Sequence, residues 1–307
     1  MTTYVDTRAP AVYNCAMPGG GNRLAHGRPG SARPAPQEES SMIVSDLGSH
    51  WQIVLQPDHA ALCRQFAERW GGGEFQPPVS LEPLAIASAR HDDGWAVWER
   101  APGHDSASGR PLNFLDIAVP VHLAFWRAAT AAVSSQDPYA GVLVSLHGAG
   151  IYRGRFGMQP DLKMTFADDV RAQVDTFVQE QERAYPSFLE RYQVDEPELW
   201  GNYRFLQVYD LLSLYFSGQD MAGGLTAGEP GILKPVPTGY DDAVADITVE
   251  PLGEDTCRLS PYPFRGSENT FALSRRRVEK RSWADDEAFR AALRTAGEDI
   301  LRIRLVA

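Results

Sequence analysis

Long hydrophobic runs are missing from this sequence of 307 residues. The longest, such as GVLVSL at 141–146, are far shorter than the roughly 20 residues that a membrane-spanning helix needs, and the N-terminus lacks the apolar core of a signal peptide. Cysteine is also scarce: Cys15, Cys63 and Cys257 are odd in number and widely separated, so no disulfide framework is indicated. We therefore expect a cytoplasmic protein that does not enter a membrane.

Basic residues are also few: the chain has 29 Lys and Arg residues against 40 Asp and Glu residues, which gives a net charge of −11. A surface of this sign repels nucleic acid and anionic membranes. The expected partner is a small-molecule substrate. The oligomeric state is left open.

The pattern along the chain changes twice. Residues 1–41 hold five prolines and five glycines without periodicity, which predicts a disordered tail, and Met42 is a candidate for the true start. Residues 42–225 show helical periodicity and predict a helical domain. Residues 226–307 contain short alternating runs such as DITVEPL and TCRLSPYPF, which predict a small β-rich appendage packed on it. The predicted fold class is thus mainly α, a helical bundle with a small β-rich C-terminal appendage.

Several candidate helices carry a histidine or aspartate on an apolar face. His59, His122 and His147 each have apolar neighbours at three- and four-residue offsets, and Asp210 lies in a helix that is apolar nearly all round. The segment of His147 could also be a buried strand.

A single inward histidine is usually a satisfied core residue, but several are harder to explain that way. An unpartnered buried polar group costs roughly 1–3 kcal/mol, so the inward groups must bind one another or a ligand. Imidazole and carboxylate together are the usual ligands of Fe, Mn or Zn.

The order of these candidate ligands along the chain resembles that of the HD-domain metalloprotein superfamily, which is named for an adjacent metal-binding His and Asp. His-Asp also occurs at 104–105 in a loop-like segment, so the dipeptide alone carries little weight. The match lies in the order of residues on separate segments: His59, His91, Asp92, His122, His147 and Asp210. The segments QPDHAAL, HDDGWAVWE, PYAGVLVSLHGAGIY, LQVYDLLSLYF and PYPF also resemble a family known as domain of unknown function 3891, over about 42–305.

The superfamily resemblance implies an HD-like domain with a divalent metal cofactor, two ions of Fe, Mn or Zn. One ion would be held by His59, His91 and Asp210 and the other by His122 and His147, with Asp92 bridging them. A carboxylate can span ions roughly 3.5–4 Å apart. One departure from the superfamily is that Gly94 and Trp95 stand near where many hydrolytic members have glycine and lysine.

The expected activity is metal-dependent hydrolysis of a phosphate ester or nucleotide. Asp93 and Arg110 are the candidate catalytic residues, Asp93 as general base and Arg110 as an anion clamp, although a helix-end cap and a solvated arginine are the plainer interpretations. Trp95, Tyr152, Arg153 and Arg155 are the candidate substrate-binding residues. One alternative is a non-haem diiron oxygenase, whose drier pocket the aromatic residues would suit. Another is a non-catalytic helical binding protein.

Overall fold

The structure, a computed structural model, describes residues 42–157, 166–218, 231–253 and 255–307. The predicted tail at 1–41 and the predicted boundary at 225–226 lie outside these residues. Five of the α-helices described here, α1, α3, α4, α6 and α7, begin where the sequence places a proline in the first turn. The helices are α1 Gln56–Arg69, α2 Leu81–Arg90, α3 Val119–Gln136, α4 Pro138–Ile151, α5 Asp168–Glu182, α6 Tyr185–Tyr192, α7 Glu196–Ser217 and α8 Asp286–Ala296.

The larger sheet has seven strands in the order β1-β2-β8-β9-β7-β6-β5, and all neighbours are antiparallel except β7 and β9. Its strands are β1 Ile43–Asp46, β2 His50–Val54, β5 Gly231–Pro237, β6 Val244–Gly253, β7 Thr256–Ser260, β8 Glu268–Glu279 and β9 Asp299–Val306. A second sheet pairs β3 His104–Asp105 with β4 Arg110–Pro111. The described residues also form four short 3₁₀ helices, η1 Asp93–Trp95, η2 Trp98–Arg100, η3 Phe114–Asp116 and η4 Gly154–Gly157.

The predicted fold class is wrong. The sheet is a large, curled, mixed layer and not a small appendage, and it takes strands from both ends of the described chain, since β2 pairs with β8. The extent of the sheet could not be predicted from the sequence because its strands are amphipathic. Along β8, buried Phe271 and Leu273 alternate with more exposed positions, and its end reads Ser-Arg-Arg-Arg, so no long apolar run marks the strand.

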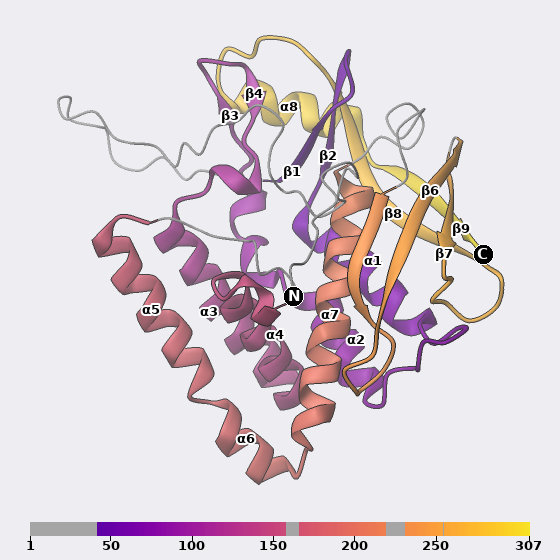
Figure 1. Cartoon of the computed structure of the whole chain (residues 1–307). Helices are drawn as coiled ribbons and strands as arrows, with labels where there is room; N and C mark the ends of the chain where they lie inside the picture. The colour runs from indigo at the N-terminus through magenta and orange to yellow at the C-terminus, as the bar shows by residue number, and fades with distance from the viewer. Residues whose placement is uncertain (1–41, 158–165, 219–230, 254) are drawn as a thin grey trace, which may run out of the picture.

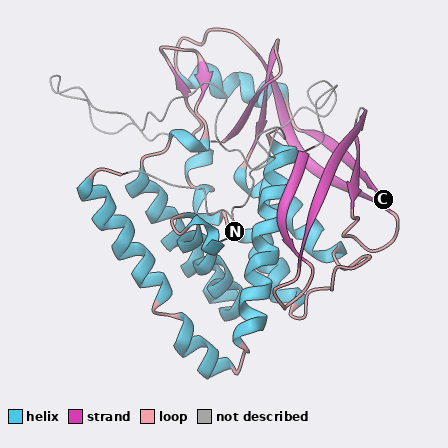
Figure 2. Cartoon of the chain, in the orientation of Figure 1, coloured by secondary structure: helices cyan, strands magenta, loops and turns pink. Residues whose placement is uncertain are grey.

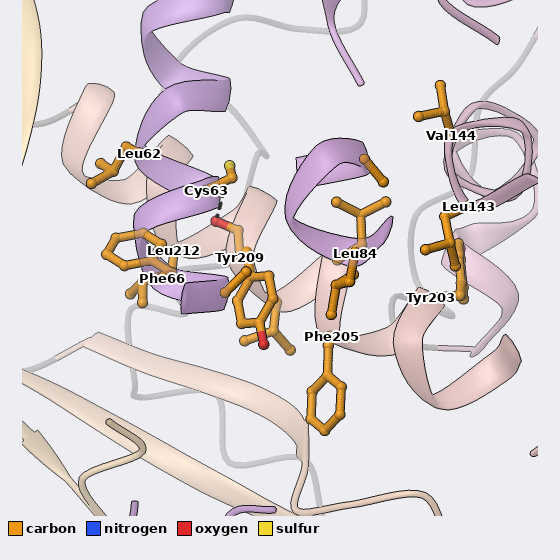
Figure 3. Packing of buried hydrophobic residues seen from close by; sticks show 14 of the residues in the cluster. Leu62, Cys63, Phe66, Leu84, Leu143, Val144, Tyr203, Phe205, Tyr209 and Leu212 are labelled. Atoms are coloured by element: carbon orange, nitrogen blue, oxygen red, sulfur yellow. Dashed lines mark hydrogen bonds between the residues drawn. The ribbon is translucent and has the colours of Figure 1, made fainter. Parts of the chain in front are cut away.

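The helices and the sheet share a hydrophobic core (Figures 1 and 2). Helix α1 contacts β8 on one side and α7 on another. Phe66 of α1 packs its ring 4.9 Å from that of Phe271 on β8, and Trp70 lies 5.2 Å from Tyr209 of α7. Figure 3 shows Leu62, Cys63 and Phe66 beside residues of α7, including Tyr209. The sheet thereby supports α1 and α7, the helices that carry His59 and Asp210.

Candidate metal centre

His59 lies on the buried face of α1 and is 1% exposed. Ser213 of α7 donates its hydroxyl hydrogen to the carbonyl of His59 at 2.8 Å, which ties the two helices together at this level. The His59 Nε2 atom lies 3.0 Å from Oδ1 of Asp210, also on α7. Its Nδ1 atom is buried without a hydrogen-bond partner among the described residues. The α1–α7 packing therefore places an imidazole directly against a buried carboxylate.

His91 and Asp92 follow the end of α2, where the chain enters η1. His91 Nδ1 lies 3.0 Å from the carbonyl oxygen of Ser88, so it donates its hydrogen there and leaves Nε2 with a free lone pair in the neutral ring. Gly94 permits this path: a Cβ at that position would lie 2.2 Å from the backbone oxygen of Phe125 on α3. The glycine serves a close approach of backbones.

Four donor atoms converge at this point. His91 Nε2 lies 3.2 Å from Asp92 Oδ2 and 3.5 Å from Asp210 Oδ1, and His59 Nε2 lies 3.8 Å from Asp92 Oδ2. All four side chains are at most 8% exposed. Despite these short distances, His91 Nε2 makes no hydrogen bond within the part of the chain that is described.

The electrostatics of the cluster favour a cation. Burial alone lowers the pKa of His91, but the carboxylates of Asp92 and Asp210 outweigh it and raise the pKa to about 10. Burial raises the pKa of Asp92, yet His91 and His59 bring it below its usual value. Burial acts likewise on Asp210, whose pKa nevertheless falls well below its usual value because of Arg155 and the imidazoles. Two ionised carboxylates in a buried site require compensating positive charge.

The donor set fits a divalent metal ion. Metal–nitrogen and metal–oxygen distances of about 2.0–2.2 Å in a tetrahedral site separate neighbouring donors by roughly 3.3–3.6 Å, and four of the six donor pairs here lie 3.0–3.8 Å apart. The hydrogen bond from His91 Nδ1 to a backbone carbonyl is the usual support of a ligating imidazole. Two overlapping triads have donor atoms within 4.8 Å of one another: His59, Cys63, His91 and His91, His147, Asp210. Asp92 belongs to neither triad and joins the cluster through its contacts with His59 and His91.

Cys63 is a poorer donor than Asp92. Its Sγ atom lies 4.0 Å from His59 Nε2, and it donates its hydrogen to the backbone oxygen of Tyr209 at 3.5 Å. Burial and the charge of Asp210 raise the pKa of the thiol well above its usual value, which disfavours the thiolate that metals bind.

Arg155 and Gln207 form the next layer. Arg155 Nη1 lies 2.8 Å from Asp210 Oδ2, and it also donates to Oε1 of Gln207. Gln207 Nε2 in turn lies 2.6 Å from His147 Nδ1. His147 is 2% exposed, and burial lowers its pKa to about 3, so the ring is neutral at physiological pH. The arginine and the glutamine thus connect Asp210 to His147.

His122 lies beside the cluster with both ring nitrogens engaged. Trp126 donates its indole hydrogen to His122 Nε2 at 2.9 Å, and His122 Nδ1 lies 2.8 Å from the hydroxyl of Tyr152. Trp95 packs against the same ring at 5.4 Å. Burial lowers the pKa of His122 to about 4. The structure therefore places His122, Trp95 and Tyr152 together in an aromatic wall near the cluster.

The remaining predicted catalytic and substrate-binding residues form ion pairs outside the cluster. Asp93 accepts from Arg90 at 2.7 Å. Arg110 binds Asp116 at 2.8 Å, and Arg153 binds Glu182 at 3.2 Å. The structure thus brings His59, His91, Asp92, His147, Asp210 and Arg155 together, whereas Asp93, Arg110 and Arg153 are engaged by other partners.

Gln207 and Glu99 were missed as functional candidates. Gln207 stands three residues before Asp210 on one helix, so helical spacing alone places both on neighbouring faces. Glu99 is buried and accepts from the backbone N–H of Gln56 at 2.7 Å. Burial raises the pKa of Glu99 to about 9. No feature of its local sequence WER separates this glutamate from a solvated one.

Fold and cluster together define an α+β protein with a buried histidine–aspartate centre formed by α1, α7 and the segment that follows α2. The chain belongs to the family described as Protein of unknown function (DUF3891), which it matches over residues 42–280. This confirms the narrower of the two resemblances in the sequence, whereas the HD-like resemblance stays a prediction. No curated protein and no solved structure matches the chain. Among the described residues, no helix is both long and apolar enough to cross a membrane.

Proposed function

We propose that this protein is a metal-dependent hydrolase of phosphate esters or nucleotides. The observation that carries the proposal is the convergence of His59 Nε2, His91 Nε2, Asp92 Oδ2 and Asp210 Oδ1 in a buried site. A neutral His91 directs its free lone pair at two carboxylates, an arrangement that a proton or a metal ion must relieve. A divalent ion that kept a coordination position for water beside these donors would lower the pKa of that water and stabilise negative charge on the attacked group.

The protein's own residues would divide the remaining tasks. Arg155 is 7% exposed and its Nε hydrogen has no partner among the described residues, so it is the cation available to an oxyanion of the substrate. Asp92 adjoins both imidazoles and can accept the proton of an attacking water. Trp95 and Tyr152 keep the surroundings of the cluster dry, which strengthens these electrostatic interactions. Asp93, Arg110 and Arg153 have no part in this scheme because their ion-pair partners, Arg90, Asp116 and Glu182, lie outside the cluster.

Metal analysis and a substrate panel test the proposal. We expect protein purified without added metal to carry Fe, Mn or Zn, and the metal-loaded protein to cleave at least one member of a broad panel of phosphoesters and nucleotides. His91→Ala should lose the metal, and the exposed His50 on β2 supplies the matched control His50→Ala. Metal-free wild-type protein that takes up none of these ions on dialysis would leave the non-catalytic binding protein as the better interpretation.

The diiron oxygenase remains an alternative without a specific observation in its favour. Two irons would need ligands beyond the four convergent ones, and His122 directs its nitrogens at Trp126 and Tyr152. Mössbauer spectra of anaerobically purified protein, combined with oxygen uptake, would separate the two chemistries.

A further inference from the structure

The segment that follows α4 carries a buried arginine in an unusual backbone conformation. Arg155 and Phe156 have φ angles of 50° and 49°, in the left-handed region that non-glycine residues rarely adopt, and glycines with positive φ flank them at 154 and 157. This path directs the Arg155 side chain inward, where it is 8% exposed and reaches Asp210. A conformation this unfavourable persists only where the surrounding contacts hold it.

Arg155 fixes the orientation of the Gln207 amide. A guanidinium has only donors, so the Gln207 atom that it contacts is the oxygen, and the amide nitrogen faces His147 Nδ1. His147 Nδ1 must then accept a hydrogen bond, which leaves the proton of the neutral ring on Nε2. In this state His147 has no free lone pair for a metal.

The other imidazole of the expected second ion is engaged in the same way. Trp126 has only a donor, so His122 Nε2 accepts its hydrogen, and the neutral His122 ring donates from Nδ1 to Tyr152. His122 is therefore held as a hydrogen-bonding group independently of Arg155. The donors left for a second ion are His147 and the second oxygen of Asp210, which is ion-paired with Arg155.

From this geometry we infer that the centre holds one divalent ion and that the Arg155 guanidinium takes the place and the charge of a second. The inference rests on the proposed metal site and deepens it. One ion is held by His59, His91, Asp92 and Asp210. The guanidinium occupies the outer oxygen of Asp210 and, through Gln207, keeps His147 in the tautomer that does not bind metal.

The number of Mn²⁺ ions bound by the full chain tests the inference. Isothermal titration with Mn²⁺, and elemental analysis after desalting, should give one ion per wild-type chain even with excess metal. The electron paramagnetic resonance spectrum should be that of isolated Mn²⁺ without exchange coupling. Two coupled ions in the wild type would overturn the inference and leave the proposed function standing, whereas binding of no ion would defeat the metal site itself.

Substitution of Arg155 gives the second arm of the test. In Arg155→Ala the outer oxygen of Asp210 is released and Gln207 is free to turn, so that His147 Nε2 regains its lone pair; the stoichiometry should rise from one to two. Arg155→Lys keeps the positive charge and should stay at one. Arg153→Ala removes an exposed arginine of the same segment, paired with Glu182, and should also stay at one.

A single ion in Arg155→Ala, with circular dichroism showing a folded protein, would overturn the role given to Arg155. If that variant does not fold, the wild-type count and spectrum still decide between one ion and two.

Discussion

At the scale of single residues, burial has opposite consequences for two neighbouring acids. Asp92 keeps its charge because two imidazoles face it, and its pKa lies below the usual value. Glu99 has burial as its dominant influence and a single backbone donor, so its pKa rises to about 9. Position relative to cations, and not residue type, therefore sets which of the two carboxyl groups is ionised at neutral pH.

Glu99 should make stability depend on pH. The unfolded chain loses this proton near pH 4.5 and the folded chain near pH 9, so the contribution of Glu99 is full below pH 4.5 and is lost as pH rises towards 9. The slope is at most about 1.4 kcal/mol per pH unit. Urea unfolding at pH 5.5 and 8.5 should show a smaller loss for Glu99→Gln than for wild type. Glu74→Gln, at an exposed glutamate, should leave the wild-type difference unchanged.

Gly94 should tolerate no side chain. Its Cβ would meet the backbone of Phe125, which cannot move without shifting α3, and we expect Gly94→Ala to destabilise the protein by roughly 2–4 kcal/mol. Thermal unfolding measures the effect. Gly109→Ala is the control: this glycine has a φ of 68° but open space around it, so the cost should be only about 1 kcal/mol. Equal effects of the two substitutions would contradict the close approach inferred at Gly94.

At the scale of elements, two of the buried histidines lie at the C-terminal ends of helices. His91 caps the C-terminus of α2, and His147 lies near the C-terminal end of α4. Helix α4 begins with a side-chain cap, since Asp137 accepts from the backbone N–H of Ala140 at 2.8 Å. Asp195 precedes α7 at the corresponding position but makes no side-chain cap hydrogen bond within the described residues.

The two aspartates offer a matched pair of substitutions. Asp137→Ala should cost about 1 kcal/mol because an N–H of the first turn of α4 loses its acceptor. Asp195→Ala removes no such bond and should destabilise the protein by only a few tenths of a kcal/mol. Chemical denaturation of both variants measures the difference, and a larger effect at Asp195 would show that the cap on α4 contributes little.

At the scale of the whole molecule, the sheet is part of the framework of the site. The strand β9 lies between β8 and β7, and Phe66 of α1 packs against Phe271 of β8 and Phe264 beside it. Helices and strands contribute to one hydrophobic cluster. The α1–α7 contact that joins His59 to Asp210 is therefore supported by strands that lie much further along the chain.

A chain that ends at residue 225 should not fold. It would lack β5–β9 and expose the faces of α1 and α7 that pack on them. The full chain should unfold in one cooperative transition, with circular dichroism at 222 nm and tryptophan fluorescence giving the same midpoint. A soluble, helical fragment of residues 42–225 that retains bound metal would contradict this expectation.

Much of the candidate site could be predicted from the sequence because helical periodicity is a local property. Residues three and four positions apart share a helix face, so the inward direction of His59, His147 and Asp210 follows from their neighbours. His122 shows the limit of this reasoning. Its face is also apolar, but Trp126, one turn away, donates to its Nε2. Orientation of a ring within its face depends on contacts that spacing does not specify.

Most helices, the residues that begin and end them, and the inward histidines and aspartates could be predicted from the sequence, since these follow from local backbone preferences and from the cost of burying unpaired groups. The sheet and the partner of each polar group depend on the folded chain. Strand pairing joins β2 to β8 across more than 200 residues, and an amphipathic strand rich in arginine has no local signal strong enough to announce it. The placement of Arg155 against Asp210 likewise depends on how α4 and α7 pack, because an ion pair between distant segments exists only once the chain has folded.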